Sequence, residues 1–87
     1  MYLKSSVWHN STMIQDREVI RRTLIRNIRK YRLQAKLTQQ EAAERANITD
    51  KYWQRLEMKS QADLPSLPVL FSMAKALGIK AYRLLQD

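Results

Sequence analysis

The sequence contains no cysteine and only one histidine, His9. A disulfide and a thiolate metal site are therefore excluded, and a single histidine does not make a zinc site. We expect no metal and no cofactor. A glycine-rich phosphate loop, a pair of catalytic carboxylates and a Ser/His/Asp set are all missing, so we expect no catalytic residues and no enzyme activity.

Glycine and proline are nearly absent, with one Gly and two Pro among 87 residues. A small β fold needs more turn residues than these. Leu, Ile, Ala, Gln, Arg and Lys are abundant and favour helices. Because 87 residues leave room for one domain, we predict a single all-α domain.

Long apolar runs are absent as well. No run approaches the roughly 20 residues that span a bilayer. The N-terminus also lacks the apolar segment of a signal peptide. We therefore expect a cytoplasmic protein that does not act at a membrane.

The net charge is +8, and it is distributed unevenly. Residues 17–36 contain eight basic residues and one acidic residue, whereas residues 37–57 contain three basic and four acidic residues. A basic small domain indicates phosphate backbones or anionic membranes as partners. Lipid binding is the weaker alternative, because the basic residues surround most of the helix expected here and no Trp/Phe insertion face accompanies them.

Residues 1–16 show no sustained period, and we interpret them as an N-terminal arm preceding a domain at 17–87. From about Asp16, apolar residues recur at helical spacing. They are Ile20, Leu24, Ile28, Tyr31 and Ala35.

Capping signals divide the remaining chain into four further helices. Thr38 to Glu41 forms a capping box, and Asn47 is expected to end the next short helix in a left-handed conformation. Thr49 is expected to cap a helix from Asp50 to about Glu57. Ser66 is expected to cap a helix that stops near Gly78, and a last short helix covers about 80–86. The expected fold thus has five helices.

Two short helices joined by a turn, at residues 38–57, form a helix-turn-helix unit. Trp53 and Leu56 mark the buried side of its second helix. The opposite side carries Asp50, Lys51, Gln54 and Arg55. By pattern alone these four residues fit either a face that meets the edges of DNA bases or an ordinary solvated face.

The caps, small residues and core positions of this region resemble the Cro/C1-type (XRE) helix-turn-helix family. The residues that carry the resemblance are Arg32, Lys36–Ala43, Ala46–Thr49, Leu56, Glu57, Pro65–Leu67, Leu70, Ala74, Leu77–Ile79, Leu84 and Leu85. It extends from about Ile28 to Leu85. It implies a compact, five-helix, lambda-repressor-like domain that regulates transcription by binding double-stranded DNA, with repression as the expected mode.

The resemblance also implies residue roles. Base-reading positions are Asp50, Lys51, Gln54 and Arg55, and phosphate-binding positions are Gln39, Gln40, Thr49 and Lys59. Arg32 and Glu57 match a semi-buried salt bridge that brackets the motif. The sequence departs from the family in having Asn47 for the turn glycine, a longer loop after Glu57 with Lys59 in place of a glycine, and an acidic base-facing residue, Asp50. We expect Asp50 to accept from a cytosine amino group or to orient Lys51 or Arg55.

Two expectations concern residues around the motif. Arg22, Arg26 and Arg29 either line the DNA backbone or form a solvated face. Ile79, Tyr82 and Leu85 are expected to form a homodimer interface that sets two recognition helices about one DNA turn apart on a pseudo-palindromic operator. The alternative function is an antitoxin-like or adaptor module that uses the same fold to bind a protein.

Overall fold

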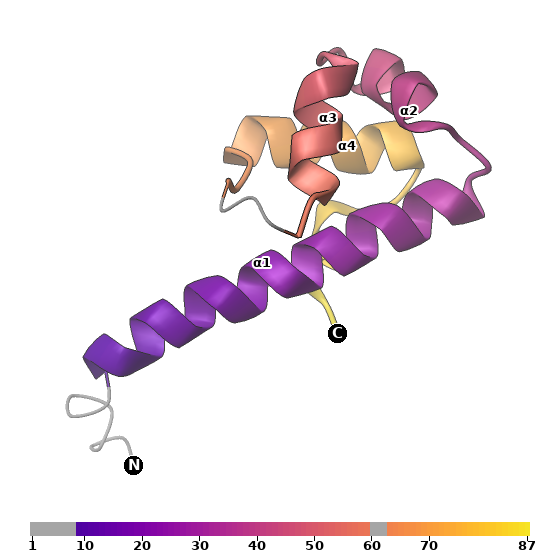
Figure 1. The fold of residues 1–87 in the computed structure, drawn as a ribbon. Coiled ribbons are helices and arrows are strands. Elements are labelled where there is room, and N and C mark those ends of the chain that lie inside the picture. The colour runs from indigo at the N-terminus through magenta and orange to yellow at the C-terminus, as the bar shows by residue number, and fades with distance from the viewer. Residues whose placement is uncertain (1–8, 60–62) are drawn as a thin grey trace.

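The computed structural model describes residues 9–59 and 63–87 of the chain. These residues form four α-helices and one 3-10 helix, with no strand (Figure 1). The helices are α1 (His9–Gln34), α2 (Gln39–Ala46), α3 (Asp50–Glu57), α4 (Leu67–Leu77) and the 3-10 helix η2 (Ala81–Leu85). The all-α prediction is confirmed, but the prediction of five helices is wrong, because the last element is a five-residue 3-10 helix.

Helix α1 begins at His9, earlier than the start near Asp16 that the sequence period predicts. Residues 1–8 of the predicted arm lie outside the described residues. The N-terminal half of α1 extends past the other helices (Figure 1), and Val19 and Ile20 are exposed there. Apolar residues recur at helical spacing only where a helix packs against a core. This pattern therefore does not reveal the turns of α1 that lie beyond the core.

Three helices end in the same way, with one residue in the left-handed conformation. Lys36 (φ 60°) follows α1, Asn47 (φ 59°) follows α2 and Gly78 (φ 73°) follows α4. After each, the next amide donates back into the helix: Leu37 to the Arg32 carbonyl at 3.1 Å, for example. This is the Schellman arrangement, which satisfies the last carbonyls of a helix. The sequence predicts it at Asn47 and Gly78, whereas Lys36 carries no such signal.

The core lies where α2 packs against both α3 and α4. Ala42, Ala43 and Ala46 are buried on α2, and their small side chains let the helix axes approach closely. Trp53 of α3 and Met73 of α4 are fully buried beside them. Leu24 and Ile28 of the predicted α1 stripe join this core, whereas Ile20 and Ala35, at the two ends of the stripe, are exposed.

Helix α1 fastens η2 through a buried amide. The Asn27 Nδ2 atom donates to the carbonyls of Arg83, Leu84 and Gln86 at 3.2, 3.0 and 2.6 Å. Leu84 is fully buried in the same place. Because these carbonyls accept hydrogen bonds from Asn27 on α1, they do not need the i→i−4 hydrogen bonds of an α-helix. The segment is a 3-10 helix, although its apolar residues suggest an α-helix.

Two classes of feature are absent from the described residues. None of their helices has both the length and the apolar character needed to cross a bilayer. They also contain no cluster of three side chains able to ligate a metal ion.

Candidate nucleic-acid interface

Helix α3 has one buried and one exposed side. Trp53, Leu56 and Glu57 are buried. The four predicted base-reading residues, Asp50, Lys51, Gln54 and Arg55, are all exposed. Thr49 caps the N-terminus of this helix, and its Oγ1 accepts from the Tyr52 amide at 3.1 Å. Capping therefore engages the Thr49 hydroxyl on the first turn of α3 and leaves the polar side of the helix open to solvent.

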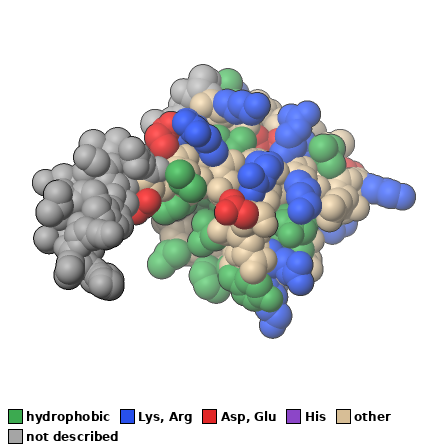
Figure 2. Space-filling model, turned by 90° about the horizontal axis from the view of Figure 1, so that it is seen from below, with side chains coloured by type: hydrophobic (Ala, Val, Ile, Leu, Met, Phe, Trp, Pro, Cys, Tyr) green, Lys and Arg blue, Asp and Glu red, His purple; other side chains and the backbone are tan. Residues whose placement is uncertain are grey.

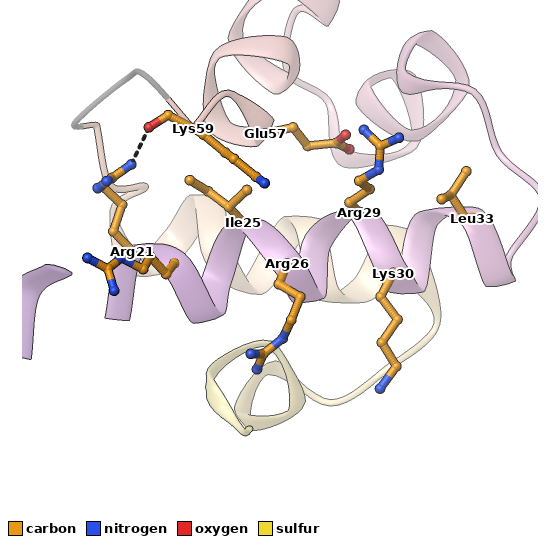
Figure 3. Close-up of a pocket in the computed structure, with 9 residues that line it drawn as sticks. Arg21, Ile25, Arg26, Arg29, Lys30, Leu33, Glu57 and Lys59 are labelled. Carbon is orange, nitrogen blue, oxygen red and sulfur yellow. Dashed lines mark hydrogen bonds between the residues drawn. The ribbon is translucent and has the colours of Figure 1, made fainter. Parts of the chain in front are cut away.

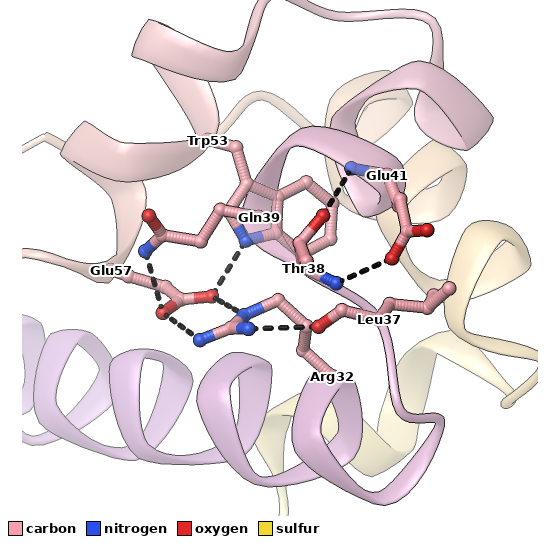
Figure 4. Close-up of polar contacts among 7 residues, drawn as sticks. All are labelled: Arg32, Leu37, Thr38, Gln39, Glu41, Trp53 and Glu57. Carbon is pink, nitrogen blue, oxygen red and sulfur yellow. Dashed lines mark hydrogen bonds and ion pairs between the residues drawn. The ribbon is translucent and has the colours of Figure 1, made fainter.

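A buried carboxylate ties α3 to α1 and α2. Arg32 Nε donates to Glu57 Oε2 at 2.6 Å and Arg32 Nη2 donates to Glu57 Oε1 at 3.2 Å. Trp53 Nε1 donates to Oε2 at 2.6 Å, and Gln39 Nε2 donates to Oε1 at 3.0 Å (Figure 4). Arg32 Nη1 donates to the Leu37 carbonyl as well, at 2.9 Å. We call Arg32, Gln39, Trp53 and Glu57 the Glu57 network.

The Glu57 network is saturated and charged. Burial by itself would raise the pKa of the Glu57 carboxyl. The hydrogen bonds from Arg32, Trp53 and Gln39, with the charge of Arg32, outweigh burial and hold this pKa below its ordinary value of 4.5. Among the described residues, every buried side-chain nitrogen and oxygen has a hydrogen-bond partner. The network therefore fixes α3 on α1 and α2 rather than offering a ligand site.

The N-terminus of α2 has two kinds of donor near the surface. The Gln39 side-chain amide, predicted to hold a phosphate, donates to Glu57 instead. The capping box engages the Glu41 amide, which donates to Thr38 Oγ1 at 3.0 Å. The backbone amides of Gln39 and Gln40 precede it in the first turn, where helical amides have no acceptor within the helix. Gln40 itself is exposed. These amides, with the helix dipole, suit an anion.

A groove separates α1 from the end of α3 and has a volume of about 1020 Å³ (Figure 3). Its lining is mainly basic and comprises Arg21, Arg22, Ile25, Arg26, Arg29, Lys30, Leu33, Glu57 and Lys59. Arg21 Nη1 donates to the Lys59 carbonyl at 2.8 Å and so joins α1 to the chain that leaves α3. The acidic lining residue, Glu57, is neutralised by Arg32. The groove therefore presents positive charge beside α3.

The three α1 arginines predicted to bind phosphate do not occupy equivalent positions. Arg29 points toward Glu57 and the end of α3, whereas Arg26 points toward the C-terminal segment (Figure 3). Arg26 Nη2 lies 3.5 Å from the Asp87 carboxylate, and Arg22 Nη2 lies 3.8 Å from that of Glu18. Lys and Arg side chains are spread over the face of the molecule that lies below in Figure 1, with few acidic ones among them (Figure 2).

Arg55 pairs with an acid that the sequence reasoning did not single out. Its Nη2 atom lies 3.1 Å from Asp63 Oδ2. Asp50, expected to orient Arg55 or Lys51, is therefore not the carboxylate that holds Arg55. Asp63 lies eight residues further on, in the connection to α4, and no sequence pattern marks this pairing. The Trp53–Glu57 bond, by contrast, has the i,i+4 spacing of neighbours on one helix face.

The predicted dimer residues differ in exposure. Tyr82 and Leu85 on η2 are 54% and 48% exposed, whereas Ile79 is partly buried against the core. On α4, Leu67 and Phe71 are also exposed, and Phe71 shares a smaller groove with Ile79. The described surface thus carries apolar side chains at two of the three predicted positions.

Comparison with known proteins identifies one family for this region. The family model described as "Helix-turn-helix" matches residues 28–84, about two thirds of the chain. The match runs from the second half of α1 into η2, and so contains the Glu57 network and the exposed side of α3. Arg22 and Arg26 lie before it. No curated protein and no solved structure matches the chain.

Proposed function

Because this chain belongs to the Cro/C1-type helix-turn-helix family, we propose that it regulates transcription by placing α3 in the major groove of double-stranded DNA. The observation that carries the proposal is the two-sided character of α3: one side is fixed by the core and the Glu57 network, and the other is exposed and polar. The major groove is wide enough for one helix, and it displays a distinct pattern of donors and acceptors for each base pair.

The exposed residues of α3 suit different bases. Lys51 and Arg55 are donors that match the O6 and N7 acceptors of guanine. Asp50 is an acceptor that matches the amino group of cytosine, and Gln54 is able to both donate and accept. A G·C base pair therefore presents a suitable partner for either charge sign on this helix.

Phosphate contacts are proposed on both sides of α3. The backbone amides of Gln39 and Gln40 in the first turn of α2, with the side chains of Gln40 and Thr49, face one strand as anion-binding groups at helix N-termini. Arg29, Lys59 and Arg22 face the backbone from the groove between α1 and α3. Arg26 also lines this groove but contributes less, because its guanidinium is engaged by the Asp87 carboxylate and the Gln86 carbonyl. Such contacts raise affinity without reading sequence.

We further propose that the protein acts as a repressor and as a homodimer. One recognition helix contacts only a few base pairs, and a two-fold dimer doubles the site. Tyr82 and Leu85, with Ile79 behind them, supply the apolar surface for contact between η2 of the two copies. A repressor of this size acts by occupying a pseudo-palindromic operator.

The binding experiment is a mobility shift with random duplex at low salt, followed by selection of bound sequences. We expect the wild-type protein to bind random duplex and to enrich a pseudo-palindrome. Lys51→Ala and Arg55→Ala are each expected to weaken enrichment and to relax the preference at the base pair that the residue reads, and Lys75→Ala, at an exposed lysine on α4, serves as the control. If no duplex is bound at low salt, the DNA-binding function is wrong and the protein-binding adaptor becomes the better hypothesis.

The oligomer is tested separately by sedimentation equilibrium on the wild type and on a Tyr82→Ala/Leu85→Ala variant. We expect a dimer for the wild type and a shift toward monomer for the variant, with selected half-sites one DNA turn apart in the wild type. The same sedimentation behaviour for both proteins would remove η2 from the interface. A reporter assay with the selected operator upstream of a promoter then separates repression from activation.

A further inference from the structure

Arg55, one of the four proposed base-reading residues of α3, already contacts other side chains of the protein. The Arg55–Asp63 contact is a single hydrogen-bonded ion pair of 3.1 Å, and its side chains are 53% and 44% exposed. The Arg55 guanidinium also lies over the Tyr52 ring, with its central carbon 5.6 Å from the ring centroid. The guanidinium is thus held at one edge by a carboxylate and on one face by an aromatic ring.

This arrangement leaves most of the guanidinium available. Arginine has five N–H donors in a planar fork, and the contact with Asp63 uses one of them, at Nη2. A bidentate contact with guanine needs two more. The pair with Asp63 therefore leaves enough donors for a base contact, and it restricts the directions in which the long side chain can point.

The negative charge of Asp63 disfavours the alternative contact, in which Arg55 binds a DNA phosphate instead of a base. A phosphate bound by the same guanidinium would lie close to the Asp63 carboxylate, 3.1 Å from Arg55, and would be repelled by its negative charge, whereas a guanine base carries no charge. Contact with phosphate on any sequence is thereby disfavoured, whereas contact with guanine retains the pair. Disfavouring the wrong contact is as effective for specificity as strengthening the right one.

We propose that Asp63 is a positioning residue for DNA sequence specificity, which holds Arg55 for base contact and against phosphate contact. This inference rests on the proposed DNA-binding function and concerns a residue outside α3. It assigns part of the specificity to a residue in the connection between α3 and α4.

The test is Asp63→Asn, a change that keeps the shape of the side chain and removes its charge. We expect its affinity for random duplex to rise about twofold to fivefold, the range of an exposed ion pair. The slope of log K against log salt should become steeper by up to about 1, since Arg55 gains a phosphate contact. Sequence selection should show a relaxed preference at the base pair that Arg55 reads and an unchanged preference elsewhere.

Asp87→Asn is the matched control. It removes one surface carboxylate from an arginine pair, Arg26–Asp87, and changes net charge equally. Its effect on affinity should be the same for all sequences, with no relaxed position. A second control places Asp63→Asn in an Arg55→Ala background, where the change should no longer affect base preference.

The outcomes separate the inference from the function on which it rests. Asp63→Asn selecting the same bases as wild type, with the same ratio of specific to random binding, overturns the role of Asp63. The same relaxation with and without Arg55 also overturns it, because Asp63 would then act through another residue. Failure of the wild type itself to bind duplex overturns the proposed function instead. Thermal unfolding of each variant shows that it is folded at the assay temperature.

Discussion

Helix α3 takes part in two arginine–carboxylate pairs that differ in almost every physical respect. Arg32 and Glu57 have side chains only 10% and 2% exposed and are joined by two hydrogen bonds. Arg55 and Asp63 are half exposed and are joined by one. Water screens the second pair, and solvated groups compete for it. The Arg32–Glu57 pair is shielded from water and from competing groups, so it fixes α3 on the other helices. The Arg55–Asp63 pair remains open to a ligand.

The basic residues divide along similar lines. Arg32 lies inside the region that the family model matches, and its charge is paired with that of Glu57. Arg22 and Arg26 lie before that region on exposed surface. The net positive charge is therefore concentrated on α1, because α2 and α3 together carry little net charge.

The largest effect should follow from breaking the buried pair. Glu57→Ala leaves Arg32 charged and poorly solvated, and we expect it to lower the free energy of unfolding by about 3–5 kcal/mol. Urea denaturation measures this value. Glu44→Ala on the exposed side of α2 is the control. A loss below about 1 kcal/mol, the range of exposed pairs, would show that the Glu57 network is not isolated from solvent.

Removing the exposed arginine should affect binding and leave folding nearly unchanged. Arg55→Ala is expected to cost about 1–3 kcal/mol at the selected operator and to relax one base position. Titration of operator and of a sequence altered at that position, in both proteins, provides the measurement. An equal loss on both DNAs would place Arg55 on a phosphate.

Acid should weaken the buried pair in a predictable direction. The pKa of Glu57 is below 4.5 in the folded protein, so its contribution is complete above 4.5 and is lost as pH falls through the folded value. The difference in unfolding free energy between wild type and Glu57→Gln should therefore shrink in acid. A difference that stays constant to the lowest pH of reversible folding would contradict this.

Removing Arg29 from the groove should have a smaller effect on DNA affinity, and this effect should not depend on the DNA sequence. Arg29→Ala is expected to lower affinity equally for operator and random duplex and to reduce the salt slope by about 1. Arg26→Ala, at the Asp87 side of α1, should change the slope less. Equal slopes for wild type and Arg29→Ala would assign Arg29 to a solvated face.

The smallest effect should be that of the exposed pair on stability. Asp63→Ala is expected to change the unfolding free energy by less than about 1 kcal/mol, because the pair is exposed. Urea denaturation of this variant and of Glu57→Ala, measured side by side, compares the stability lost from the exposed pair with that lost from the buried pair. Comparable losses for the two variants would erase the distinction between them.

Local signals made much of the motif predictable. The capping box at Thr38 and Glu41 and the left-handed Asn47 depend on residues three to five positions apart, and both occur as the sequence indicates. The exposed side of α3 follows from the spacing of Trp53 and Leu56. Such features are read from the sequence because their partners lie within one or two helical turns.

The resemblance to the family predicted one contact between distant segments, the Arg32–Glu57 pair, but two others have no signal in the sequence. Asn27 donates to carbonyls 56 to 59 residues away and so holds the last element, a 3-10 helix, against α1. Asp63 meets Arg55 across a connection whose path the sequence does not specify. The turns of α1 before Asp16 were missed for a different reason, since an amphipathic pattern develops only where a helix has a core to face.

Helix α1 is one element by its hydrogen bonds and two by its surroundings. Its 26 residues span about 39 Å at the usual rise per residue, and only the later turns lie against the other helices (Figure 1). The earlier turns depend on helix propensity and on pairs such as Glu18–Arg21, which hold an isolated helix only weakly. Amide hydrogen exchange should therefore be graded along a single continuous helix, slow from Leu24 onward and progressively faster toward His9, with no boundary that the backbone geometry alone would reveal.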